Sequence, residues 1–180
     1  MEEEIKKRTC TSKAKGNSFE NRVAKELGIW MFNDKDMLNR HLTSGAQKSV
    51  WVGDIVPQKQ LPIHFNNGHF PFLIECKNGY KSNIPNLNNQ TIVRQWLTKA
   101  KLEATANQNV IYLITSFHAY SPLLFTDVPF NITSGLILNH IHNGDVTPFY
   151  VYEYRKLLEH QFFSLYEGCE EIIKRINQSQ

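Results

Sequence analysis

An acid and a base, Glu75 and Lys77, stand one residue apart near the end of the apolar segment 70–80, FPFLIECKNGY. The apolar run predicts a buried strand. Residues two apart in a strand share a face, so these two side chains project together, while Ile74 and Cys76 point into the other layer. The pair is either part of a reactive site or an ordinary solvated charge pair that contributes little.

A second acid, Asp54, also lies at a strand end. It follows Gly53 in segment 49–57, SVWVGDIVP, which is rich in β-branched and aromatic residues and is closed by a proline. If the two strands are antiparallel neighbours, about 4.8 Å apart, the carboxylates of Asp54 and Glu75 lie side by side. They would repel each other unless a cation intervened.

A hard divalent cation resolves that repulsion. Mg²⁺ takes oxygen ligands, few of them from the protein, and leaves the other positions to water and phosphate. We therefore expect Asp54 and Glu75 to hold Mg²⁺. Lys77 would orient the attacking water and offset the charge that builds on a phosphate during hydrolysis.

A helix that begins at Asn17 would carry a third carboxylate, Glu20. Apolar residues recur there at steps of four, four and three, as on one face of a helix: Phe19, Val23, Leu27 and Trp30. Glu20 stands three residues after Asn17, so it is either a capping residue or a metal ligand. Lys99, one turn after Trp96 on a second predicted helix over 88–108, either faces the same site or is solvated.

These pieces predict an α/β fold with a central mixed sheet. The order is helix, strand, strand, helix and strand, where the last strand is segment 109–115, NVIYLIT. The hairpin pair is antiparallel and the crossover helix returns the chain in parallel. Strand-like segments follow at 122–128, 134–141 and 147–154, then a helix across roughly 155–176. We expect a flexible basic arm over residues 1–15 and a single domain over 16–180.

Composition excludes several classes of protein. The three cysteines, Cys10, Cys76 and Cys169, show no CxxC motif or paired spacing, which argues against a disulfide framework or a zinc site. We find no membrane span and no signal peptide, so we expect a soluble cytoplasmic protein. The net charge of +3 suits an anionic partner without identifying one.

In order along the chain, four motifs resemble the PD-(D/E)XK nuclease superfamily: Glu20, the segment RHLTSGA at 40–46, GDI at 53–55 and IECK at 74–77. Within it, the sequence is most similar to archaeal and phage Holliday-junction resolvases. These open with KGxxFE, which is matched by Lys15, Gly16, Phe19 and Glu20. The resemblance covers about residues 15–115. The chain departs from the pattern at Gly53, which replaces a nominal proline, and in the long connection before Glu75.

The resemblance implies a restriction-endonuclease-like core, with a mixed β-sheet flanked by helices. It implies that Mg²⁺, replaceable by Mn²⁺, is held by Glu20, Asp54, Glu75 and the carbonyl of Cys76, with Lys77 as the catalytic lysine. Arg40 and Ser44 would contact the scissile phosphate, with Lys15 as a further DNA contact. Arg40 and Ser44 could equally be a surface charge and a turn residue.

The sequence thus predicts a Mg²⁺-dependent DNA endonuclease, most specifically a Holliday-junction resolvase of recombination and repair. A viral or mobile-element source would fit this prediction, but no residue establishes one. Two alternatives stay open: a recombination or concatemer-processing nuclease on flaps or linear duplex, and a non-catalytic DNA-binding module. Cutting two symmetric strands of a four-way junction favours a homodimer. The aromatic residues Phe149, Tyr152, Phe162 and Phe163 are candidates for its interface or for the core.

Overall fold

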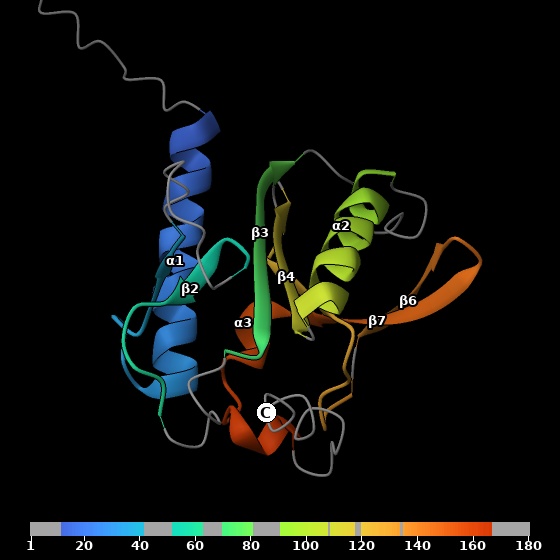
Figure 1. Cartoon of the computed structure of the whole chain (residues 1–180). Helices are drawn as coiled ribbons and strands as arrows, with labels where there is room; N and C mark the ends of the chain where they lie inside the picture. Colours follow the sequence, from blue (N-terminus) through green and yellow to red (C-terminus); the bar gives the residue numbers. More distant parts are fainter. Residues whose placement is uncertain are drawn as a thin grey trace, which may run out of the picture.

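A seven-stranded mixed sheet lies at the centre of the computed structural model, which describes residues 12–41, 52–62, 70–80, 91–107, 109–117, 120–133 and 135–166 (Figure 1). Its order is β1-β2-β3-β4-β5-β7-β6. The strands are β1 (Leu38–Arg40), β2 (Ile55–Pro57), β3 (Phe72–Tyr80), β4 (Val110–Phe117), β5 (Leu123–Thr126), β6 (Leu136–His142) and β7 (Asp145–Glu153). The helices are α1 (Ser12–Phe32), α2 (Thr91–Asn107) and α3 (Tyr154–Leu157), followed by the 3₁₀ turn η3 (Phe163–Tyr166).

The expected mixed sheet is confirmed around β3. Ile55 of β2 pairs with Ile74 in an antiparallel register, whereas β4 runs parallel to β3 from Phe72↔Val110 onwards. Helix α2 connects the two parallel strands, as such a crossover requires. β1, which pairs antiparallel with β2, was not predicted, because its three residues are too few for a periodic pattern.

The two faces of β3 carry different residues, as its alternating pattern predicts. Ile74 and Cys76 pack in the apolar cluster with α1, whereas Leu73 packs in the cluster with α2. Glu75 and Lys77 share the face of Leu73. Near the end of β3, the register with β4 shifts between Asn78 and Tyr80, and Gly79 there has a φ of +84°. This β-bulge leaves Gly79 without a register partner on β4.

Helix α1 begins earlier than the sequence pattern predicts. It starts at Ser12, so residues 12–15, which we assigned to the flexible arm, are helical. Asn17 therefore lies inside the helix and is not its N-cap, and Glu20 is not on the first turn. The remainder of the predicted arm, residues 1–11, lies outside the described residues. Among the described residues, no helix is long and apolar enough to span a membrane.

The three strands expected in the second half are present as β5, β6 and β7. Asn143 and Gly144, with φ values of 52° and 89°, form the turn between β6 and β7, as is common for an Asn-Gly pair. The long helix expected over 155–176 is wrong in its first half. Helix α3 ends at Leu157, and residues 167–180 lie outside the described part of the chain.

Most of the aromatic residues that we considered for an interface belong to the core. Phe149, Tyr152 and Phe162 are at most 5% exposed, while Phe163 is 54% exposed. The Phe162 ring packs edge-on against those of Trp30 and Phe72, 5.0 and 5.9 Å away between centroids. Only Phe163 of the four is therefore available to a partner.

Candidate active site

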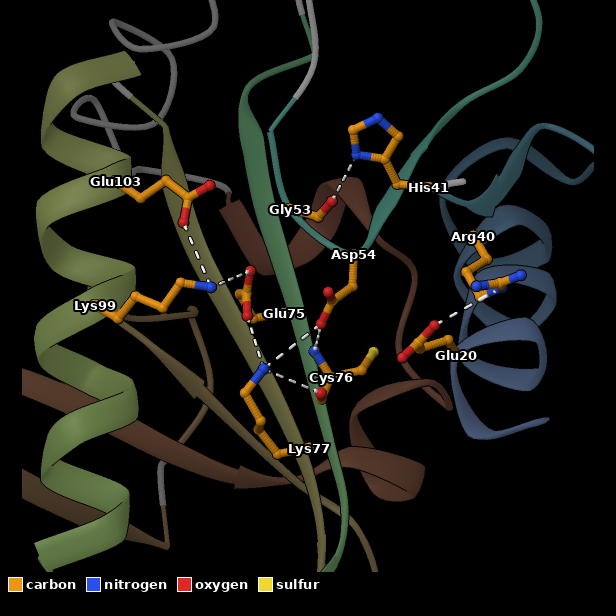
Figure 2. Close-up of polar contacts among 10 residues, drawn as sticks. All are labelled: Glu20, Arg40, His41, Gly53, Asp54, Glu75, Cys76, Lys77, Lys99 and Glu103. Atoms are coloured by element: carbon orange, nitrogen blue, oxygen red, sulfur yellow. Dashed lines mark hydrogen bonds and ion pairs between the residues drawn. The ribbon is translucent and has the colours of Figure 1, made fainter. Parts of the chain in front are cut away.

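Lys77 lies among three oxygen atoms at the edge where β2 begins beside β3 (Figure 2). Its ammonium group donates hydrogen bonds to Oε2 of Glu75 at 2.8 Å and to the carbonyl oxygen of Cys76 at 3.3 Å. Oδ2 of Asp54, immediately before β2, is 3.7 Å away. The side chain of Glu75 is 5% exposed and that of Lys77 is 20% exposed. Three of the oxygens proposed as metal ligands thus surround one partly buried cationic group.

Asp54 is held in place by backbone contacts to β3. Its amide donates to the carbonyl of Ile74 at 2.8 Å, and its Oδ2 accepts a hydrogen bond from the amide of Cys76, also at 2.8 Å. From the other side, the amide of His41 donates to the carbonyl of Asp54 at 2.7 Å. These contacts aim the carboxylate of Asp54 along β3, toward Lys77.

Gly53 allows this close approach to β3. Its φ of +95° lies in the left-handed region that favours glycine. A Cβ atom at this position would be 2.8 Å from the carbonyl oxygen and 3.1 Å from the amide nitrogen of Ile74. The departure from a proline at this position therefore has a structural reason in this chain, since a proline could not adopt that φ.

The electrostatics of the site keep Lys77 charged. Burial lowers the pKa of Lys77, but the carboxylates of Glu75 and Asp54 outweigh that effect and the pKa is raised overall. Burial, followed by the negative charge of Glu75, raises the pKa of Asp54, against the opposing effects of the Cys76 amide and Lys77. The site thus stabilises the charged ammonium of Lys77 and disfavours the charged form of Asp54.

Glu20 and Arg40 lie on the other side of β3 from α2, toward α1 (Figure 2). Nε of Arg40 is 3.8 Å from Oε2 of Glu20, and both side chains are partly exposed. Burial, and next the negative charge of Asp54, raise the pKa of Glu20. Among the described residues, however, no three His, Cys, Asp or Glu side chains lie close enough together to hold a metal ion.

The other predicted site residues have varied positions. Cys76 directs its buried thiol into the α1 side of the core, where burial raises its pKa, and presents its carbonyl to Lys77. Lys15 is exposed on α1, and its backbone carbonyl accepts a hydrogen bond from Nδ2 of Asn78 at 3.0 Å. Ser44 lies outside the described residues.

Lys99 faces the site from α2. Of the two alternatives left open by the sequence, a position at the site or a solvated position, the first applies. Its ammonium is 3.7 Å from Oε1 of Glu75 and 4.0 Å from Oε2 of Glu103, and its side chain is 66% exposed. Sequence reasoning missed Glu103 and His41. Nδ1 of His41 lies 3.1 Å from the carbonyl oxygen of Gly53, a contact that depends on the pairing of β1 with β2.

The donor atoms around Lys77 fit a hard divalent cation. Two carboxylates and one backbone carbonyl offer only oxygen, the ligand type that Mg²⁺ and Mn²⁺ prefer. The ammonium of Lys77 already stands among these oxygens as a cation. The residues present are therefore compatible with a metal ion at this edge of the sheet.

The mixed sheet flanked by helices agrees with the α/β fold of the PD-(D/E)XK class of nucleases. Residues 11–179 match the family described as "Phage putative PDDEXK endonuclease". The chain belongs to this family, whose name indicates an endonuclease. No curated protein and no solved structure matches the chain.

Proposed function

We propose that the chain is a DNA endonuclease that uses Mg²⁺, with Mn²⁺ as a substitute, to hydrolyse phosphodiester bonds. The observation that carries this proposal is the arrangement of the Asp54 and Glu75 carboxylates and the Cys76 carbonyl around the ammonium of Lys77. Membership of a PDDEXK endonuclease family supports the same reaction class.

Each side chain has a role that follows from its position. Asp54, Glu75 and the Cys76 carbonyl would hold the ion, and Glu20 would join them from α1. The bound ion would act as a Lewis acid and lower the pKa of the attacking water. Lys77, kept charged by its two carboxylates, would donate a hydrogen bond to the phosphate and offset its growing negative charge. Arg40 would contact the scissile phosphate, together with Ser44 and Lys15.

Cleavage should require a divalent cation, and the choice of ion should matter. We expect turnover with Mg²⁺ or Mn²⁺, and DNA binding with little turnover in Ca²⁺. Ca²⁺ accepts six to eight ligands in a loose geometry and would position the water poorly. Gel analysis of labelled DNA after incubation with each ion measures this. Robust cleavage in EDTA would contradict the proposed mechanism.

We infer further that the substrate is a four-way DNA junction, cut by a two-fold symmetric homodimer. The support is the resemblance of the opening segment to the junction resolvases, together with the need for two cuts on symmetric strands. Since Phe149, Tyr152 and Phe162 are in the core, the apolar candidates for the interface are exposed side chains: Phe163, and Ile137, Ile141 and Val146 on the hairpin β6–β7.

Cleavage of DNA molecules of different shape tests the proposed substrate. With Mg²⁺, we expect faster cleavage of a labelled four-way junction than of a flap or a linear duplex of the same sequence, with paired cuts at symmetric positions. Sedimentation of the protein should give about twice the chain mass of 20.9 kDa. A strict monomer, also on junction DNA, or preferred cleavage of the flap or duplex, would replace the resolvase proposal with the flap or duplex nuclease.

A further inference from the structure

A cavity of about 410 Å³ lies at the ends of β3 and β4. Asn78 and Gly79 line it from β3 and Ser116 from β4, and Ser121 and Arg155 complete its polar lining. We refer to it as the Arg155 cavity. Asn78 directly follows Lys77 in the chain, so the cavity begins one residue beyond the proposed catalytic lysine.

Three polar side chains of this cavity, those of Ser116, Ser121 and Arg155, have no hydrogen-bond partner among the described residues. Arg155 is exposed and makes no hydrogen bond or ion pair with any described residue. The hydroxyl groups of Ser116 and Ser121 also have no partner in the described part of the chain. Among the described lining residues, none is acidic. The guanidinium group of Arg155 has two hydroxyl groups nearby and no carboxylate in the described lining to compete for it. This arrangement is suited to bind an anion.

The local backbone leaves the mouth of the cavity open. The β-bulge of β3 removes Gly79 from the register with β4, and a Cβ atom on Gly79 would meet no atom of the described residues within 4 Å. Tyr120, which also lines the cavity, is 47% exposed and adds an aromatic surface beside the donors. An anionic group attached to a sugar or a base would contact the donors, and the sugar or base would contact the ring of Tyr120.

We propose that the Arg155 cavity binds a phosphodiester of the DNA strand next to the scissile phosphate, an inference that rests on the proposed endonuclease function. A guanidinium group binds phosphate with two parallel hydrogen bonds. From Lys77 to Gly79, β3 advances about 7 Å. One DNA strand rises about 3.4 Å per nucleotide along its axis, so the bound phosphate lies about two nucleotides from the cut.

Binding measurements on a non-cleaving background test this cavity separately from the nuclease chemistry. The parent is the full chain with Asp54→Asn, and the two variants add Arg155→Gln or Lys156→Gln. Lys156 is the matched control, because it is the adjacent lysine of α3 and its ammonium pairs with Glu153 at 2.8 Å outside the cavity. The probe is labelled DNA, titrated with protein over a series of salt concentrations.

We expect Arg155→Gln to weaken DNA binding about tenfold at low salt. It should also reduce the slope of log affinity against log salt by about 0.9, the value for one lost phosphate contact on duplex DNA. Lys156→Gln should leave the slope unchanged. An unchanged slope for Arg155→Gln, or an equal loss for both variants, would overturn the proposal.

A second measurement locates the phosphate. After the cut site has been mapped with the unsubstituted protein, single neutral methylphosphonates replace the phosphates one and two nucleotides away on either side. One of them should weaken binding by the parent but not by the Arg155→Gln variant, as expected for two groups in contact. Equal weakening in both proteins at every position would reject the cavity, whereas a failure of the unsubstituted protein to cleave any DNA would reject the nuclease function instead.

Discussion

Replacement of Asp54 by Asn, or of Glu75 by Gln, should abolish DNA cleavage and leave the fold and DNA binding largely intact. Each variant removes one of the charged oxygen donors proposed to hold the ion, and we expect a loss of at least about 10³-fold in rate. Lys77→Ala should cost about 10²–10³-fold, as for one preorganised electrostatic partner.

The structure explains why the fold should survive these changes. An asparagine at position 54 still offers a side-chain oxygen to the amide of Cys76, which now donates to Oδ2 of Asp54 at 2.8 Å. Removal of one negative charge also relieves the repulsion that contributes to the raised pKa of Asp54. Asp34→Asn is a matched control, because Asp34 pairs with Lys59 at 2.6 Å on the exposed surface away from the site.

Cleavage rates at saturating Mg²⁺ and thermal unfolding curves should be measured together on all these proteins. The Asp34→Asn protein should cleave at the normal rate. If Asp54→Asn or Glu75→Gln retained near-normal cleavage with an unaltered dependence on metal, the assignment of that residue would be wrong.

Among the described glycines of positive φ, Gly53 should be the one at which replacement by alanine destabilises the protein most. The new Cβ would lie 2.8 Å from the carbonyl oxygen of Ile74, so strand β3 or the chain before β2 must move. The backbone conformation costs about 1 kcal/mol for alanine, and the overpacking about 1–3 kcal/mol more. We therefore expect a loss of about 2–4 kcal/mol in the free energy of unfolding, accompanied by reduced cleavage because Asp54 is displaced.

Gly144→Ala separates the cost of the backbone conformation from the cost of overpacking. Gly144 has nearly the same φ, +89°, but a Cβ there would lie more than 4 Å from every atom in the described part of the chain. This variant should lose only about 1 kcal/mol, the cost of the backbone conformation alone. Denaturant unfolding gives both free energies. Equal losses for the two variants would show that the approach of Gly53 to β3 is not tight.

Local patterns predicted those parts of the fold that depend on neighbouring residues. The alternation in segment 70–80 placed Glu75 and Lys77 on one face of β3, opposite Ile74 and Cys76, because a strand alternates with a period of two. The apolar spacing that begins at Phe19 likewise predicted the buried face of α1.

Contacts between distant segments were beyond that reasoning. The chain after α3 turns so that Phe162 packs on Trp30, and the indole of Trp30 donates a hydrogen bond to the carbonyl of His160 at 2.8 Å. This packing against α1 overrides the helical pattern that we extended from residue 155. Similarly, no local pattern marks His41 as a partner of Gly53, since that contact exists only once β1 has paired with β2.

The position of Lys77 has a consequence for how the protein matures. Its ammonium offsets the charge of Glu75 and Asp54 and donates a hydrogen bond to the carbonyl of Cys76. In zinc fingers, by contrast, the ligands have no stable arrangement before the metal arrives, and metal binding is itself the folding step. Since Lys77 offsets the charge of the proposed ligands, we expect a newly synthesised chain to fold first and to acquire the proposed ion later. Removal of that ion would then silence the enzyme reversibly while the polypeptide stays folded.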